Sequence, residues 1–138
     1  MIVFYDRRQS VSTNDSFSPS AQKPAQVVKS WKQLGIPYEV RTFAPLTAEE
    51  IALAHDPGYV AGVLDCKRAN GFNNRSPEVA KALPWVCGSM AASALHSLQT
   101  GETTFSPTSG AHHAGFCHGG GFCTFNFLII NFICHHQS

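Results

Sequence analysis

The side chains best suited to chemistry gather in one glycine-rich stretch, residues 108–126. It contains three histidines and two cysteines, types that transfer protons or bind metal ions near neutral pH: His112, His113, His118, Cys117 and Cys123. Five of the chain's eleven glycines also lie here. Such density is typical of backbone that adopts unusual conformations or approaches a ligand closely, so this stretch is the first candidate for a functional site.

The same histidines allow a plainer interpretation. Adjacent histidines in a loop are often half-buried and held by backbone hydrogen bonds, with no catalytic role. The spacing is also poor for zinc, because the stretch has neither a C-x-x-C nor an H-x-x-x-H pair. The glycine density and the doublet of His112 and His113 together still favour a site.

Strands and helices alternate around this stretch. Runs of β-branched and aromatic residues predict strands at residues 2–6, 38–43 and 103–107. Start and stop signals predict four helices, which begin at Pro24, Thr47, Asp56-Pro57 and Ser76-Pro77. This alternation predicts an α/β fold, a three-layer sandwich with a mostly parallel sheet. Because sites in such sheets lie at the carboxyl ends of strands, the loop after residue 107 is well placed for function.

Several finer expectations follow from single residues. The polar residues 9–23 and 65–75 predict surface loops rather than packed elements. The longest helix is expected to end at Gly101, to be kinked or split at Pro84, and to bury one stripe: Val79, Leu83, Val86, Met90, Ala94 and Leu98. Six further residues favour structural roles: His55 as a capping or packing residue, His96 as a solvated one, Trp31 and Trp85 as core, and Cys66 and Cys87 as buried thiols.

Composition excludes several classes of protein. The chain has 138 residues, of which 43% are hydrophobic and 14% charged, enough for one globular domain with a core. Its net charge of +1 and scattered basic residues indicate no nucleic acid and no membrane partner. The five cysteines form no C-x-x-C pair, and the charges of the N-terminus follow its apolar residues, the reverse of a secretory signal. We therefore expect free thiols and a cytoplasmic location.

Four segments resemble one family in their order along the chain. They are HDPGYV at residues 55–60, NGFNNRSPE at 70–78, SPTSGAHHA at 106–114 and GFCTFN at 121–126. Together they resemble the N-terminal portion of the zinc-dependent histone deacetylase and acetylpolyamine amidohydrolase family. The resemblance implies the fold shared by arginases and deacetylases, truncated here, with residues 1–126 forming the N-terminal part of that domain.

The resemblance also implies roles for particular residues. His112 matches the histidine that orients and helps to deprotonate a zinc-bound water, and His113 the one that protonates the leaving amine. Phe122 matches an aromatic wall of a narrow tunnel for an acyl-lysine or acyl-polyamine side chain, and Gly121 and Phe72 are the other candidate substrate-binding residues. The polar loops match the rim that selects the substrate, an acetylated small molecule or peptide.

The chain departs from the family after Asn126. The family's zinc ligands and its carbonyl-polarising tyrosine lie further downstream, whereas this chain has no Asp or Glu after Glu102. We therefore assign no metal ligands and expect no cofactor in this chain as it stands, although the family uses zinc. Residues 127–138 form a divergent apolar tail whose β-branched and aromatic run replaces the small-residue helix of the family.

Three interpretations of function remain. The first is a truncated deacetylase-like protein that is inactive alone, and the second is a non-catalytic self-associating binding or metal-binding module. The third is an active zinc amidohydrolase, whose missing ligands come from another polypeptide or whose reduced metal site is made by His112, His113 and His118 with Cys134, His135 and His136. The apolar tail is expected either to fold back over an uncovered face or to form a symmetric dimer, which Ile130→Asp would then disrupt.

Overall fold

The three predicted strands pair in one parallel sheet. The computed structural model describes residues 1–13, 16 and 18–136. Strand β1 (Ile2–Phe4) lies between β2 (Glu39–Arg41) and β3 (Thr104–Phe105), with Val3 opposite Val40 on one side and Phe105 on the other. The predicted sheet is confirmed, and Val3 and Phe4 are buried. All three residues of β2 are exposed, so only the centre of the sheet is covered on both faces.

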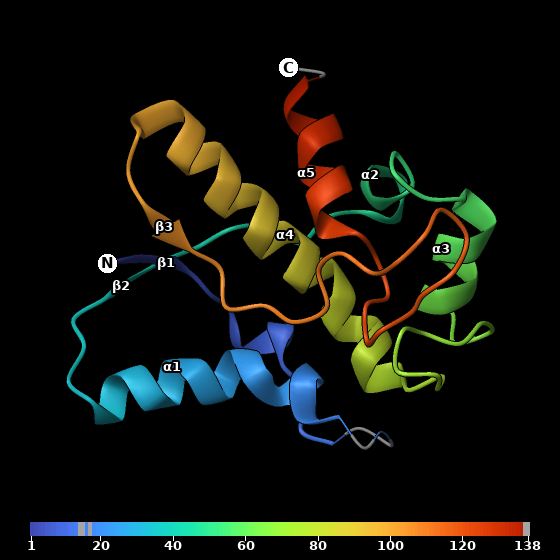
Figure 1. Ribbon diagram of the computed structural model, residues 1–138, viewed down its shortest axis with the longest axis horizontal. Helices are drawn as coiled ribbons and strands as arrows, with labels where there is room; N and C mark the ends of the chain where they lie inside the picture. Colours follow the sequence, from blue (N-terminus) through green and yellow to red (C-terminus); the bar gives the residue numbers. More distant parts are fainter. Residues whose placement is uncertain (14–15, 17, 137–138) are drawn as a thin grey trace.

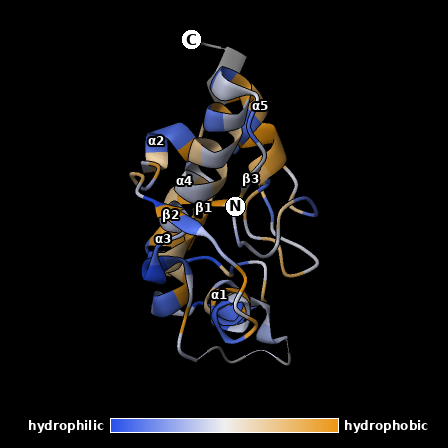
Figure 2. Ribbon diagram, turned by 90° about the vertical axis from the view of Figure 1, so that its left-hand side faces the viewer, coloured by the Kyte–Doolittle hydropathy of each residue, from blue (hydrophilic) through white to orange (hydrophobic). Residues whose placement is uncertain are grey.

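Two helices lie on opposite faces of this sheet, which confirms the three-layer arrangement (Figure 1). Helix α4 (Pro77–Thr100) packs on β1 and β3. Alternate residues of a strand point to opposite faces, so Thr104 meets α4 while its neighbour Phe105 meets Trp31 on α1 (Lys23–Gln33). Figure 2 shows α1 as a largely hydrophilic helix at the outside of the molecule.

The predicted helix starts are confirmed by their caps. Thr47 and Glu50 satisfy each other's backbone donors at the start of α2 (Ala48–Ile51). Asp56 caps α3 (Pro57–Leu64), and Ser76 caps α4. Helix α4 ends at Gly101, whose φ of +73° is the left-handed conformation that glycine adopts without strain. Pro84 lies inside α4 and does not split it.

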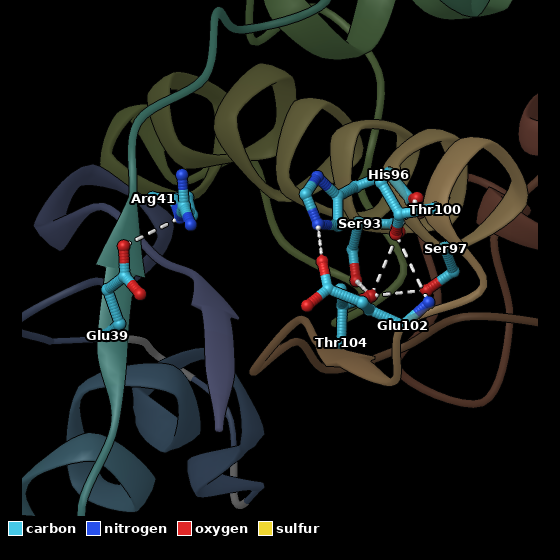
Figure 3. A network of polar contacts seen from close by, with 8 residues as sticks. All are labelled: Glu39, Arg41, Ser93, His96, Ser97, Thr100, Glu102 and Thr104. Atoms are coloured by element: carbon cyan, nitrogen blue, oxygen red, sulfur yellow. Dashed lines mark hydrogen bonds and ion pairs between the residues drawn. The ribbon is translucent and has the colours of Figure 1, made fainter.

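The sheet-facing side of α4 is polar rather than apolar at its C-terminal half. The Ser89 hydroxyl donates to the carbonyl of Phe4 at 2.5 Å and pairs with Ser106 at 2.6 Å. The Thr104 hydroxyl donates to the carbonyl of Ser93 at 2.9 Å, so the hydroxyls of Ser93 and Ser97 donate to it (Figure 3). This ladder of serines four residues apart ties the helix to the strand ends.

The ladder corrects the predicted stripe. Leu98, expected to be buried, is 71% exposed, because the serines occupy the side of α4 that faces the sheet. His96 is likewise not simply solvated: its Nε2 lies 2.9 Å from a Glu102 carboxylate oxygen, and its ring contacts Phe4 (Figure 3). Trp85 is half-buried with the Arg8 guanidinium 3.4 Å from its ring centre, and Trp31 is also half-buried.

Part of the polar segment 9–23 is packed, contrary to the surface-loop prediction. It contributes to two short 3-10 helices, η1 (Arg7–Gln9) and η2 (Pro19–Gln22). Gln9, Val11 and Ser20 are buried, and Val11 joins the hydrophobic core. Hydrogen bonds hold this segment against the rest of the chain. The Gln9 side-chain amide donates to the carbonyl of Pro107, and the backbone N–H of Val11 donates to the carbonyl of Ala21.

The apolar tail is a helix, α5 (Phe127–His136), contrary to the strand-like character of its sequence. Asn126 starts it, because its side-chain oxygen accepts from the N–H of Ile129 at 3.3 Å. Phe127 and Ile130, three residues apart on one face, are completely buried against α2 and α4. The segment thus folds back onto the core, while Leu128, Ile129 and Phe132 stay exposed.

No helix in the described part of the chain is long and apolar enough to cross a membrane. Among the described residues, Cys66, Cys117 and Cys123 are free thiols, as expected. Cys87 is buried, but Cys66 is only half-buried and has a positive φ of 60°, so the prediction of a buried thiol there is wrong.

Candidate functional site

The histidine doublet lies in the loop that leaves the carboxyl end of β3, as predicted. His112 and His113 are both exposed, and their ring centroids are 4.1 Å apart with the planes inclined at 41°. The two imidazoles are therefore in contact with each other and accessible from solvent. The arrangement suits groups that handle protons on one ligand.

Asn126 holds the backbone on both sides of the doublet. Its buried side-chain amide donates to the carbonyls of His112 and Ala114, each at 3.2 Å. One residue further, the N–H of Phe127 donates to the carbonyl of Ala111 at 3.0 Å. The start of α5 therefore fixes the loop that carries the two histidines.

His55 supports the same loop from the side of α3. Its Nε2 accepts from the N–H of Asn126 at 2.9 Å, so the ring proton is on Nδ1, which donates to the carbonyls of Gly115 at 3.0 Å and Phe116 at 3.2 Å. The ring is 1% exposed, and this burial lowers the pKa of His55 despite the opposing effect of the two carbonyls. The predicted packing role is confirmed, but sequence analysis missed that His55 positions the histidine loop; its place in the HDPGYV segment was the available signal.

The candidate substrate-binding residues lie beside the doublet. Gly121 has a φ of +54°, and a Cβ placed there would be 2.9 Å from Cγ of the His113 ring. Phe122 follows with a φ of +62°, and its ring centroid is 6.0 Å from that of Phe72. Gly121 therefore lies against His113, and Phe122 brings the ring of Phe72, which is far away in sequence, to the same segment.

Gly71, next to Phe72, packs very closely against the backbone of Cys123 and Thr124. A Cβ at Gly71 would lie 2.2 Å from the carbonyl atoms of Cys123, and its N–H donates to the Thr124 hydroxyl at 2.9 Å. The hydroxyl of Tyr59 donates to the carbonyl of Thr124 at 2.8 Å, and burial raises the pKa of Tyr59 to about 12. Tyr59 is thus a structural donor that stays protonated under physiological conditions.

The side chains do not suit the zinc that the family resemblance implies. Among the side chains that the structure describes, which end at residue 133, no group of three or more from His, Cys, Asp or Glu could hold a metal ion. His118 contacts only the carbonyl of Gly119 in its own loop, at 3.4 Å. The side chains of Cys134, His135 and His136, which the third interpretation requires, lie outside the described residues. The doublet thus lacks the carboxylates and further imidazole that a catalytic zinc centre takes.

A parallel sheet flanked by helices, with paired histidines at the carboxyl end of β3, defines a deacetylase-like α/β domain. The model of the histone deacetylase domain matches residues 18–134, so the chain belongs to this family. No sequence among the curated proteins matches it.

Two solved structures are similar in fold. The HDA15 HD domain aligns with a TM-score of 0.77 at 19% identity, over 99% of this chain and 43% of that one. An acetylpolyamine aminohydrolase from Burkholderia pseudomallei aligns with a TM-score of 0.72 at 18% identity, over 99% of this chain and 53% of that one. The chain therefore spans about half the length of these structures.

Proposed function

We propose that the chain binds acyl amines, such as acetyl-lysine or an acetylpolyamine, at His112, His113 and the two phenylalanines, and that these residues alone do not hydrolyse the amide. The observation that carries the proposal is that the paired, exposed imidazoles lie next to Gly121 and Phe122, whose ring contacts Phe72, while the described side chains include no set of ligands for a metal. An amide and its methylene chain can pack on the exposed side of an aromatic ring, and imidazole nitrogens can form hydrogen bonds with the amide oxygen or N–H.

Binding is expected to depend on Phe122. Phe122→Ala removes one ring of the facing pair and should weaken binding of an acetyl-lysine peptide at least about tenfold, measured by titration calorimetry. The matched control is Phe116→Ala in the same loop, because Phe116 is 63% exposed and contacts neither candidate ring in the observed pairs. Equal loss in both variants, or binding of the unacetylated peptide with the same affinity, would contradict the proposal.

A hydrolysis assay on the same peptide tests the second half of the proposal. We expect no turnover with or without added Zn²⁺. Turnover that requires Zn²⁺ and is abolished in His113→Ala would show a complete hydrolytic site and overturn the claim of inactivity. In that case the residues outside the described part must supply ligands.

Self-association is the second candidate function, favoured by an exposed apolar surface on α4 and α5. Its large side chains are 40–71% exposed: Leu95, Leu98, Leu128, Ile129 and Phe132. Exposed apolar side chains on two packed helices favour a contact site, and covering apolar surface contributes roughly 25 cal/mol per Å². We propose that a second copy of the chain covers it in a symmetric dimer.

The dimer is tested by sedimentation equilibrium at micromolar concentration. We expect a mass near twice 15.0 kDa, which Leu128→Glu shifts toward the monomer because a charge in the interface cannot be paired. Ile130→Asp is unsuitable for this test, since Ile130 is completely buried within one copy and the change would unfold it. Leu34→Glu, at the still more exposed C-cap residue of α1, is the control. A clean monomer for the unaltered chain would refute self-association.

A further inference from the structure

A pocket of about 350 Å³ lies between the loop after α3 and the histidine-rich loop. Neither the His112–His113 doublet nor the Phe72–Phe122 pair lines it. It is polar, and its lining includes three cationic side chains, Lys67, Arg68 and Arg75, together with Asn73, Cys117 and His118. The acyl-amine site does not account for these residues.

The charge of this pocket is positive and largely uncompensated. Lys67 pairs with Asp65 at 3.1 Å, but both side chains are exposed, so the pair is weak. Among the residues that the structure describes, no ion pair involves Arg68 or Arg75. The chain as a whole has a net charge of only +1, so this local excess is not part of a generally basic surface.

Backbone contacts hold Arg68 in place on one wall. Its N–H donates to the carbonyl of Gly62 at 2.8 Å, and its side-chain stem lies across Gly62 so closely that a Cβ there would be 2.8 Å from Cγ. Only a glycine in α3 permits this approach. The packing of the Arg68 side-chain methylenes on Gly62 therefore orients the Arg68 guanidinium.

The turn that leads to Arg75 is fixed by a pair of asparagines. Buried Asn70 donates from its N–H to the carbonyl of Asn74 at 2.8 Å and from its side-chain amide to the Asn74 side chain at 2.7 Å. Its side-chain oxygen accepts from the N–H of Phe72 at 2.9 Å. The backbone between the two arginines is consequently rigid, which lowers the entropy lost when both bind one ligand.

The opposite wall is equally well held. Gly119 is so close to Gly71 that a Cβ on it would lie 2.9 Å from the Gly71 Cα, and the N–H of Gly115 donates to the carbonyl of His118 at 3.0 Å. Cys117 and His118 themselves are exposed toward solvent. The two loops thus form a preformed polar cleft with cationic groups at its mouth.

We propose that this cleft binds an oxyanion, a carboxylate or a phosphate, between Arg68 and Arg75. Guanidinium groups bind both anions through two parallel hydrogen bonds, and a rigid turn with two of them lacking carboxylate partners is the arrangement that such binding needs. The site is independent of the function proposed for His112 and His113. It gives the chain a second ligand, an anion, that differs in charge from the neutral amide group of an acyl amine.

The test is a titration of the whole chain with inorganic phosphate and, separately, with succinate, followed by NMR amide shifts. We expect saturable shifts at residues 66–75 and 115–119. Arg68→Gln combined with Arg75→Gln should weaken binding about tenfold or more, whereas Arg41→Gln, an exposed arginine paired with Glu39 on β2, should not. Both changes are on exposed side chains, and unchanged unfolding midpoints will show that the variants fold.

The outcomes separate clearly. Stronger binding of phosphate identifies a phosphorylated ligand, and stronger binding of succinate identifies a carboxylate such as an acidic peptide side chain. Shifts spread over all basic residues, or equal weakening in Arg41→Gln, would mean general charge screening and overturn the proposal. Acetyl-peptide binding in the double variant is expected to remain, so failure of this site and failure of the proposed function are distinguishable.

Discussion

Gly71→Ala is expected to lower the free energy of unfolding by about 3 kcal/mol or more and to abolish acetyl-peptide binding. The added Cβ would lie 2.2 Å from both carbonyl atoms of Cys123 and 2.7 Å from the N–H nitrogen of Thr124. All three are backbone atoms and cannot rotate away as a side chain can. The two segments must separate, which breaks the Gly71–Thr124 bond and moves Phe72 from Phe122.

Gly120→Ala in the same loop is the control. A Cβ at Gly120 meets only the carbonyl oxygen of His113, at 3.7 Å, an ordinary van der Waals distance. We expect a change within about 0.5 kcal/mol in urea unfolding followed by circular dichroism. If both alanines destabilise the chain equally, flexibility of the glycine-rich loop, rather than the close approach at Gly71, would be the cause.

The parts of the fold that follow from local signals were predictable. The β-branched runs gave the three strands, and the side chains of Thr47, Asp56 and Ser76 gave the helix starts, because caps are formed within a few residues. The loop position of the histidine doublet followed from the strand before it. Each of these inferences needs information only from residues close in sequence.

The errors come from contacts between distant segments. The tail from Phe127 is rich in β-branched residues, yet it is helical because Asn126 caps it and because Phe127 and Ile130 find a buried face. In α4, the serines spaced by four face the sheet and not the solvent. Their hydroxyls form hydrogen bonds with polar groups at the strand ends, the carbonyl of Phe4 and the hydroxyl of Thr104. Composition and periodicity do not reveal which partner a polar side chain will meet.

The candidate site shows the same division. Its histidines and phenylalanines could be chosen from their motifs, but the roles of Gly71 and His55 depend on contacts with residues 53 and 71 positions away in the chain. The roles of His112, His113, Gly121, Phe122 and Phe72 in binding remain predictions.

Replacement of His55 is the other large effect that we expect. His55→Leu keeps the volume but removes a donor and an acceptor, so the N–H of Asn126 and the carbonyls of Gly115 and Phe116 lose their partner inside the protein. An unsatisfied buried backbone group costs about 1–3 kcal/mol, and we expect a total loss of about 3 kcal/mol with release of the histidine loop. His118→Leu, at an exposed ring in the same loop, should change stability little.

The pH dependence of the free energy of unfolding tests whether His55 is neutral in the folded chain. Because burial lowers its pKa in the folded chain below 6.5, the unfolded chain binds the proton more readily. The contribution of neutral His55 is therefore fully present above about pH 6.5 and is lost as the pH falls toward the lowered pKa, with a slope of at most about 1.4 kcal/mol per pH unit. The lowered pKa values of Asp6 and Glu78 act mainly below their ordinary values, 3.8 and 4.5, and so largely outside the window of pH 5–6.5.

Urea unfolding at a series of pH values measures this slope, and His118→Leu should retain it. If His55→Leu does not fold, the protein itself still supplies the test through NMR of the ring nitrogens. Protonation of Nε2 would remove the acceptor of the Asn126 N–H, so acid should broaden or shift the amide signals of Asn126, Gly115 and Phe116 together. A flat stability between pH 5 and 6.5, or a ring that carries its proton on Nε2 at neutral pH, would disprove that His55 holds the loop in this tautomer.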